Sequence, residues 1–426
     1  MRIAVVGGGA AGMAAAYWLD QQGHHVSVLE RQPVLGGHIR TLNKNVLPSH
    51  SNNNAILECG PLEFPDSFHN FVALMRELGV KLVPVNVGSA LFPKSGSHFL
   101  SAASTKRNFT GMQRLIEYLR FDSLYVRSAG LWLKTQFTHA NQLYDQPLSR
   151  YLVNDRISDL WLKLLAMYSY SIPFKFINNM PAELVIPMLN AYLAVNWLRV
   201  EGGVYTYIEK ILERFKGDIL LGVEIANIYR NLEAVEIELA TGETQSFDKV
   251  VFATPPDQVM ALLADPTPDE TRRFADWKPN YIKTIVHGDA SIYQQQGIHS
   301  PSEFDFFETE TQWGYSGYLN RLCAISSPQH YFLSFQLEAL IDPTSIVHIQ
   351  QHHTPMYTTE SFHYRDEIVA TNGENHTYHV GAYLGDGLHE GAITSARRVI
   401  QLIGKAIALN ASTSGWGART QSGAIP

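Results

Sequence analysis

The first thirty residues constrain the fold most strongly, because they follow a strand, turn, helix, strand pattern. Residues 3–6 form a short apolar run typical of a buried strand. The glycine-rich turn GGGAAG occupies 7–12, and a helical pattern of apolar residues then ends at Gly23. A second apolar run at 25–29 stops at Glu30. This order predicts the first βαβ unit of a doubly wound α/β domain.

The residues of this turn are those needed to hold a dinucleotide. Gly7 allows the tight turn between strand and helix, and Gly9 lets a diphosphate approach the backbone because it has no Cβ. Gly12 lets the helix pack against the sheet, and Ala11 lies where free helix N–H groups face the phosphates. Glu30 can accept hydrogen bonds from a ribose hydroxyl, and its charge disfavours a 2′-phosphate. The pattern therefore predicts a dinucleotide site that disfavours NADP.

The continuation after Glu30 distinguishes between dinucleotides. NAD-binding folds normally continue into another crossover helix, whereas here a second glycine pair, Gly36 and Gly37, follows within a few residues. These glycines allow the backbone to approach a ligand again, and Arg40 supplies a cation for a diphosphate. The polar residues expected to surround the ligand are Arg31, His38, Arg40 and Thr41. We therefore predict FAD as the cofactor.

The stretch E-R-x-x-x-x-G-G-H-x-x-T from Glu30 to Thr41 resembles the flavin amine oxidase superfamily. That superfamily includes monoamine oxidases, protoporphyrinogen oxidases, phytoene desaturases and bacterial fatty-acid isomerases. The resemblance implies an α/β fold in which a Rossmann-type FAD-binding domain, of the amine oxidase and glutathione reductase kind, is interleaved with an α+β substrate domain. Most members carry arginine where this chain has His38, so His38 and Arg40 are alternatives for neutralising the diphosphate.

The resemblance assigns three internal segments to the cofactor. Gly60, Pro61 and Leu62 match the segment that places backbone beside the isoalloxazine ring. Ile225 matches a strand and turn whose backbone contacts the adenine. Ala253 lies where a strand stops beneath the dinucleotide.

A second flavin-type segment lies near the C-terminus. A strand stops at Gly381, a glycine-rich loop follows, and a helix starts near Gly391 and runs to about Ala408. A helix N-terminus aimed at a flavin stabilises the negative charge of the reduced ring, and the matching segment has this role in the superfamily. The residues expected to contact FAD here are Gly381, Ala382, Gly391, Ala392 and Ile393. Ala382 replaces the acid that usually follows the first glycine in the superfamily. The motif G-A-Y-x-G-x-G-x-H-E-G also resembles a bacterial subgroup often encoded beside lipid-modifying enzymes.

We expect two interleaved domains. The FAD-binding domain would comprise 1–79, 200–265 and 375–410, and the substrate domain 80–199 and 266–374. The first inserted stretch is rich in aromatic residues and has long helical patterns at 112–137 and 156–170, whereas the second has alternating runs typical of strands, such as 330–337. Residues 411–426 are small and polar, which predicts a flexible tail.

The composition limits the partners and the compartment. A net charge of −7 argues against nucleic-acid binding. The two cysteines fit neither a disulfide framework nor a zinc site, and no signal sequence or long apolar segment occurs, so we expect a cytoplasmic protein without a metal. The basic residues of 112–137 indicate either a solvated face or peripheral contact with a membrane. The oligomeric state stays open.

For the chemistry we expect an FAD-dependent oxidoreductase. The leading hypothesis is hydride transfer from an apolar small molecule to flavin N5, as in the desaturation or isomerisation of a fatty-acyl or terpenoid chain in lipid metabolism. The alternatives are an amine oxidase, for which Lys283 would hold a water near N5 and Tyr383 would flank the amine, and a non-catalytic flavin-binding protein. His389, beside Glu390, is a candidate acid or base, or else part of a helix-capping pair.

Overall fold

The computed structural model describes residues 1–49, 54–96, 98–152, 158–192 and 195–416. Its first layer is a five-stranded parallel sheet in the order β10-β2-β1-β14-β20. These strands are β10 (Asp218–Leu221), β2 (His25–Glu30), β1 (Arg2–Val6), β14 (Lys249–Phe252) and β20 (Thr377–His379). The sheet thus joins segments from the start, middle and end of the chain.

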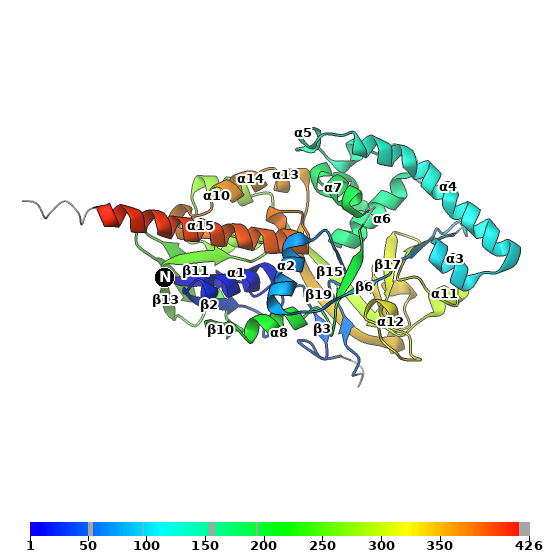
Figure 1. Cartoon of the computed structure of the whole chain (residues 1–426), viewed down its shortest axis with the longest axis horizontal. Helices are drawn as coiled ribbons and strands as arrows, with labels where there is room; N and C mark the ends of the chain where they lie inside the picture. The colour runs from blue at the N-terminus through cyan, green and yellow to red at the C-terminus, as the bar shows by residue number, and fades with distance from the viewer. Residues whose placement is uncertain (50–53, 97, 153–157, 193–194, 417–426) are drawn as a thin grey trace, which may run out of the picture.

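Helices α1 (Ala10–Gln21) and α15 (His389–Trp416) run side by side over this sheet (Figure 1). The packing is close because residues 14–16 of α1 are all alanines without exposed surface. Small side chains allow one helix to fit between a sheet and a second helix without voids. A small antiparallel sheet of β11 (Ile225–Arg230), β12 (Val235–Leu239) and β13 (Thr244–Phe247) extends the same domain.

The second layer is a seven-stranded sheet in the order β19-β15-β18-β17-β16-β7-β8. Its strands are β19 (Ile346–Met356), β15 (Lys278–His287), β18 (Phe332–Phe335), β17 (Trp313–Tyr318), β16 (Phe304–Glu308), β7 (Ser89–Phe92) and β8 (Phe99–Leu100). Because β7 and β8 come from the first inserted stretch and the others from the second, both stretches build one sheet. The domain limits themselves stay a prediction.

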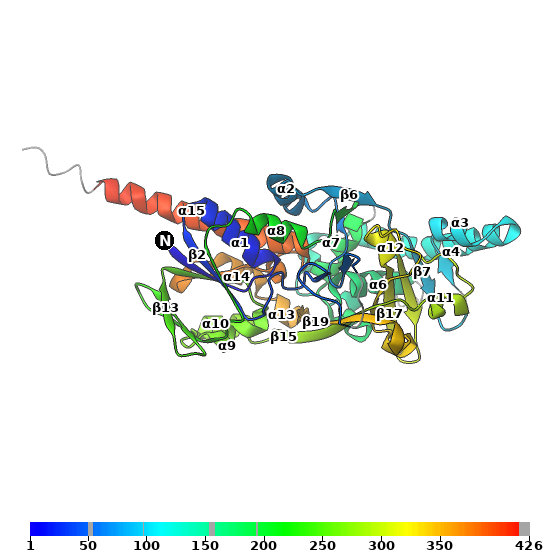
Figure 2. The same cartoon turned by 90° about the horizontal axis from the view of Figure 1, so that it is seen from below.

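Helices of the first inserted stretch lie beyond this sheet at the end of the molecule opposite to the N-terminus (Figures 1 and 2). They are α3 (Ala102–Asn108), α4 (Gly111–Gln136), α6 (Ser158–Tyr170) and α7 (Ala182–Tyr192). Helix α4 packs against α6 and α7 and forms the outer edge. The chain then returns through β9 (Trp197–Val200), which pairs with β5 (Phe64–Pro65) and β6 (Leu82–Val85).

The predicted helices and strands occur with small shifts at their ends. The helices predicted at 112–137 and 156–170 are α4 and α6, and the strand predicted at 330–337 is β18. Helix α2 spans His69–Leu78. The C-terminal helix is predicted to end near Ala408, whereas α15 continues to Trp416, so residues 411–416 of the predicted tail are helical. Residues 405–414 contain neither glycine nor proline, and nothing local stops the helix. Residues 417–426 lie outside the described part of the chain.

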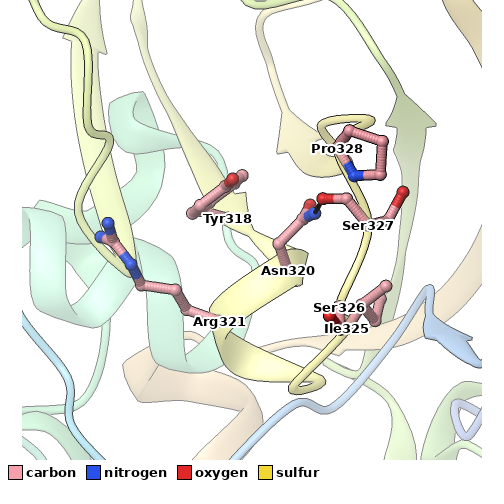
Figure 3. A pocket seen from close by; sticks show the side chains of 7 residues that line it. All are labelled: Tyr318, Asn320, Arg321, Ile325, Ser326, Ser327 and Pro328. Carbon is pink, nitrogen blue, oxygen red and sulfur yellow. Dashed lines mark hydrogen bonds between the residues drawn. The ribbon is translucent and has the colours of Figure 1, made fainter.

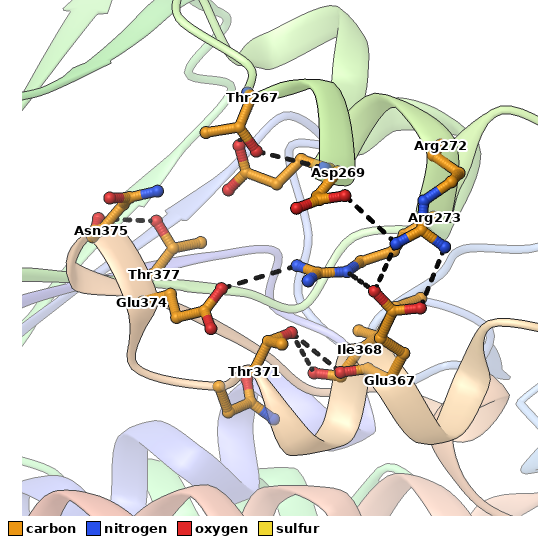
Figure 4. A network of polar contacts seen from close by, with 12 residues as sticks. Thr267, Asp269, Arg272, Arg273, Glu367, Ile368, Thr371, Glu374, Asn375 and Thr377 are labelled. Atoms are coloured by element: carbon orange, nitrogen blue, oxygen red, sulfur yellow. Dashed lines mark hydrogen bonds and ion pairs between the residues drawn. The ribbon is translucent and has the colours of Figure 1, made fainter.

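A polar network lies beside β20, the edge strand of the parallel sheet (Figure 4). Arg272 and Arg273 of α10 (Pro268–Phe274) both donate to the carboxylate of Glu367 in α14 (Arg365–Ala370). Arg273 also lies 3.7 Å from a carboxylate oxygen of Glu374. The network therefore joins two surface helices beside β20.

Beneath this network, the side chain of Arg230 is only 2% exposed and pairs with Glu270 and Asp265. Replacing Arg230 by methionine leaves the buried Glu270 carboxylate uncompensated, which is expected to lower the free energy of unfolding by about 3–5 kcal/mol. Chemical denaturation measures the loss. Arg272→Met is the matched control, because its exposed guanidinium also pairs with two carboxylates and its removal is expected to cost far less. Equal losses for the two variants would contradict the role given to Arg230.

Candidate functional site

Two glycine segments lie backbone against backbone at the C-terminal end of β1. The Gly36 N–H donates to the Gly8 carbonyl over 2.8 Å, and Gly9 and Gly36 form a parallel bridge. Gly37 has a φ of +58°, and a Cβ there would lie 3.0 Å from the Gly9 Cα. We call the segments Gly7–Gly9 and Gly36–Gly37 the glycine cradle.

Packing within the protein does not explain why residue 9 is a glycine. Its φ of −78° is open to any residue, and a Cβ would meet no atom closer than the Gly37 Cα at 3.6 Å. Gly12 is different, because a Cβ there would lie 1.9 Å from the Gly7 carbonyl oxygen. Packing therefore explains Gly12, whereas the missing side chain at Gly9 fits a diphosphate in contact with the backbone.

The predicted ribose ligand Glu30 is held rigidly beside the cradle. Its two carboxylate oxygens accept from the backbone N–H groups of Gly8 at 2.7 Å and Gln32 at 2.8 Å. The Val223 N–H donates to the Glu30 carbonyl, which brings the loop before Ile225 to the same strand end. Both carboxylate oxygens keep a lone pair for a hydroxyl donor. The arrangement fits the adenosine half of a dinucleotide.

Arg40 is a buried guanidinium without an acidic partner. Its Nη1 donates to the carbonyls of Leu35 and Ile39 at 3.2 and 3.1 Å. Asn45 Nδ2 donates to the same two carbonyls. Over the described residues, no carboxylate oxygen lies within 4.0 Å of Arg40, and burial lowers its pKa. Glu30 attracts the guanidinium only from beyond ion-pair distance, and a buried cation without a carboxylate in direct contact fits a diphosphate well.

His38 is already engaged with the backbone of another strand. Its Nε2–H donates to the carbonyl of His353 in β19 over 2.7 Å. The His38 carbonyl lies 2.1 Å from the place of a Cβ on Gly60, so Gly60 must remain glycine. Of the two alternatives for neutralising the diphosphate, this geometry favours Arg40.

The segment around Gly60 is fixed by a buried carboxylate and by the second sheet. Glu58 accepts from Thr41 Oγ1 at 2.8 Å and from the Val204 N–H at 2.7 Å, and burial raises its pKa to about 7. The Cys59 carbonyl accepts from Thr284 Oγ1 at 2.7 Å and His352 Nε2 at 2.9 Å. These contacts set the backbone of the segment that the resemblance places beside the flavin ring.

Other predicted cofactor residues line the same strand ends. A Cβ on Gly7 would lie 2.9 Å from the Ala253 carbonyl oxygen, so the ends of β1 and β14 touch. Ala11 is buried in the first turn of α1, and Leu62 is buried beside Cys59 in one apolar cluster. Arg31 is exposed, and Pro61 is half-buried.

The C-terminal segment forms a compact loop ahead of α15. The Gly381 N–H donates to Ser395 Oγ at 2.9 Å, and Asp386 Oδ1 accepts from Leu388 and Gly391 N–H groups. Ala392 and Ile393 are buried in the first turns of the helix. Asp386 was missed at the sequence level, although an acid shortly before a helix start is a capping signal that would have indicated it.

The three predicted catalytic residues lie in different settings. Tyr383 is buried with its ring 5.4 Å from that of Trp277. His389 contacts the Tyr207 hydroxyl through Nε2 at 2.8 Å, and burial lowers its pKa to about 3. Lys283 is 38% exposed and lies 3.6 Å from a carboxylate oxygen of Glu338. The structure brings Tyr383 and His389 to the two ends of the C-terminal loop. Lys283 lies beside Glu338, on the face of β15 opposite to Thr284, whose hydroxyl contacts the Cys59 carbonyl.

Glu390 caps helix α2. Its two carboxylate oxygens accept from the backbone N–H groups of Asn70 and Phe71, each at 2.9 Å. An acid at a helix N-terminus satisfies free N–H groups and interacts favourably with the helix dipole. Of the two roles considered for the His389–Glu390 pair, this geometry fits the structural one for Glu390.

Helix α6 reaches both segments that flank the expected flavin ring. The Tyr168 hydroxyl donates to Glu63, which follows Leu62, and the Tyr170 hydroxyl donates to the Asp386 carbonyl at 3.2 Å. The Tyr168 ring packs against Phe304 at 4.1 Å. Burial raises the pKa of Glu63 to about 8. These contacts, which no sequence pattern indicated, join the substrate domain to the flavin site through aromatic side chains.

A separate surface pocket of about 380 Å³ lies over α12 (Leu319–Leu322) (Figure 3). Its lining residues are Tyr318, Asn320, Arg321, Ile325, Ser326, Ser327 and Pro328. The Arg321 guanidinium already donates to Ser300 Oγ at 2.6 Å and lies 3.5 Å from a carboxylate oxygen of Glu303. None of the lining residues belongs to the cradle, and the pocket is not part of the candidate site.

Comparison with known proteins identifies the family of the chain. A family model of flavin-containing amine oxidoreductases matches residues 10–290. The 4,4'-diapophytoene desaturase of Staphylococcus aureus (strain Newman) is 23% identical over 340 residues, which cover 70% of this chain and 63% of the desaturase. The chain thus spans less than two thirds of the length of the curated relatives that it matches.

Solved structures share the fold over nearly the whole chain. A fatty acid isomerase from P. acnes superposes with a TM-score of 0.67 at 15% identity, covering 94% of this chain and 98% of the isomerase. A putrescine oxidase bound to putrescine gives 0.66 at 16% identity, covering 95% and 99%. Cyclohexylamine oxidase from Brevibacterium oxydans gives 0.65 at 12% identity, covering 96% and 99%. At these identities the likeness establishes the architecture alone.

Proposed function

Since the chain belongs to the family of flavin-containing amine oxidoreductases, with FAD as its cofactor, we propose that it acts by hydride transfer on an apolar small molecule. The substrate class would be a fatty-acyl or terpenoid chain that undergoes desaturation or isomerisation. Bound FAD supplies the redox chemistry by accepting a hydride from a substrate C–H bond. The protein supplies the binding, the orientation and the exclusion of water.

The residues that would hold FAD fall into two groups. The glycine cradle and Arg40 fit the diphosphate, and Glu30 fits the ribose of the adenosine half. The segment from Gly60 to Leu62 and the start of α15 are expected to flank the ring. The helix start would place partial positive charge near the ring, where reduction adds negative charge.

The proposal of an apolar substrate rests on the contact of α6 with the two segments that are expected to flank the flavin ring. Tyr168 and Tyr170, two residues apart on α6, reach Glu63 and Asp386. The surrounding aromatic residues are Phe304, Tyr315, Tyr357 and Trp277. Glu63, with a pKa of about 8, is mainly protonated at neutral pH and places no full negative charge there. A cluster of aromatic side chains with few charges suits contact with a hydrocarbon chain.

Amine oxidation is the second candidate. It is supported by the fold shared with the putrescine and cyclohexylamine oxidases. Against it, a cationic amine would gain more from an ionised carboxylate than from a protonated Glu63, and Lys283 is partly exposed and already pairs with Glu338. A Lys283→Met variant that loses turnover would favour the amine oxidase.

Anaerobic reduction of the bound flavin tests the proposal. The purified protein, mixed with fatty-acyl or terpenoid substrates without oxygen, is expected to lose its visible flavin absorption. Primary amines and polyamines serve as the comparison under the same conditions. Bleaching by amines and never by the apolar compounds would overturn the apolar substrate.

The cytoplasmic location also stays a proposal. It is supported by the two free cysteines, Cys59, which is buried, and Cys323, which is half-buried. Neither forms a disulfide, in keeping with a reducing compartment. Among the helices of the described residues, none is long and apolar enough to cross a bilayer.

A further inference from the structure

Helix α4 exposes an unusually apolar outer face. Seven large apolar side chains on α4 and at its C-terminal end are at least 48% exposed, with Val126 at 75% and Phe137 at 79%. The set is Met112, Leu115, Ile116, Leu119, Val126, Leu133 and Phe137. We call these residues the α4 stripe. Exposed apolar side chains scattered singly are normal, but a contiguous row marks a contact surface.

The spacing of these residues places them along one side of the helix. Leu115, Leu119, Val126 and Leu133 follow one another at intervals of four and seven residues, which repeat the same helix face. The opposite face carries the buried Glu117, Leu124 and Thr135, and the helix packs there against α6 and α7. The α4 stripe therefore points away from the body of the protein.

The position of the helix leaves this face accessible. Figures 1 and 2 show α3 and α4 at the end of the molecule farthest from the N-terminus, with α4 along the outer edge. No other helix labelled in either view covers the outer side of α4. A flat partner can approach this end without meeting the FAD-binding domain.

The charge of the surrounding segment restricts what that partner is. Residues 101–140 contain six lysines and arginines but only two acidic residues, whereas the whole chain has a net charge of −7. Arg114 and Arg120 lie at the flanks of the helix, where Arg114 donates to the Phe109 carbonyl and Arg120 to Glu117. An apolar stripe with basic residues beside it is the pattern of helices that lie in a membrane interface.

We propose that the α4 stripe docks on the surface of an anionic lipid bilayer. The apolar side chains would enter the boundary between headgroups and acyl chains, and the net positive charge of 101–140 would be attracted to anionic headgroups. A second copy of this chain fits less well, because a two-fold contact through α4 would bring two basic segments together. This docking does not depend on which substrate the flavin oxidises.

Flotation of the flavin-loaded protein with lipid vesicles tests the proposal. The wild type is expected to float with vesicles of phosphatidylcholine containing roughly one third phosphatidylglycerol, and much less with phosphatidylcholine alone or at high salt. The double variant Leu119→Glu, Val126→Glu removes two apolar contacts and adds two negative charges. Each substitution is expected to weaken partitioning about tenfold, or roughly a hundredfold together.

The matched control is Leu232→Glu, because Leu232 is 97% exposed in the turn between β11 and β12. Figure 1 shows β11 near the N-terminus, far from α4. It is expected to float as the wild type does. Retained flavin absorption and helical circular dichroism verify that each variant is folded. Equal flotation of the double variant and the wild type would overturn the proposal. A stripe variant that turns a lipid-free dimer into a monomer would also overturn it, by assigning the stripe to a second copy.

Discussion

Replacing Gly9 by alanine is expected to give a folded protein without flavin. A Cβ at this position meets no protein atom within 3.5 Å and needs no change of backbone conformation. It would, however, separate the backbone from a diphosphate and weaken its hydrogen bonds. The loss of two hydrogen bonds to a charged group costs about 3 kcal/mol or more, so FAD affinity should fall by roughly a hundredfold. Fluorescence titration of the apoprotein with FAD measures this fall in affinity.

Gly12→Ala is the control for this result. Its Cβ would lie 1.9 Å from the Gly7 carbonyl oxygen, so the first turn of α1 would have to move. This variant is expected to lose thermal stability together with flavin, whereas Gly9→Ala keeps the stability of the wild-type apoprotein. If Gly9→Ala bound FAD normally, the diphosphate would not lie against the glycine cradle.

Replacing Arg40 by glutamine is expected to weaken FAD binding without weakening the apoprotein. The guanidinium has no acidic partner within the described chain, and the carbonyls that it contacts, those of Leu35 and Ile39, keep their bonds from Asn45. Removing an unpaired buried cation should leave the stability of the apoprotein unchanged or raise it. The lost charge-assisted contact should cost about 2–3 kcal/mol, or roughly 30- to 150-fold in FAD affinity.

Arg214→Gln provides the comparison, because Arg214 likewise donates to two backbone carbonyls, those of Glu77 and Leu78. It lies at the end of α8 (Thr206–Leu212), away from the cradle, and its removal should leave FAD affinity unchanged. A fall in apoprotein stability for Arg40→Gln with unchanged FAD affinity would show that Arg40 is structural and would return His38 to consideration as the diphosphate ligand.

The cofactor half of the site was largely predictable from the sequence, because its signals are local. The turn at 7–12, the acid at Glu30 and the glycine pair at 36–37 lie within one βαβ unit and its continuation. The sequence did not show that Arg40 has no carboxylate within ion-pair distance among the described residues. Asn45, whose amide satisfies the same carbonyls, lies in a polar loop that carries no recognisable pattern.

The substrate half was less predictable because it depends on contacts between distant segments. Tyr168 meets Glu63 across a separation of 105 residues, and no spacing rule joins them. Lys283 lies in β15, where its neighbours Ile282 and Thr284 are the buried residues, so the pleat turns Lys283 outward. The apolar stripe of α4 is periodic in the sequence, but only the packing of α6 and α7 shows that this face is the outer one.

The flavin content of the purified protein tests the central claim most directly. The denatured protein is expected to release about one FAD per chain, identified by its absorption and chromatographic retention, and the native protein should be yellow. If the protein carries no flavin and the apoprotein fails to bind added FAD, while NAD or another dinucleotide binds instead, the assignment of the glycine cradle and Arg40 to FAD is wrong.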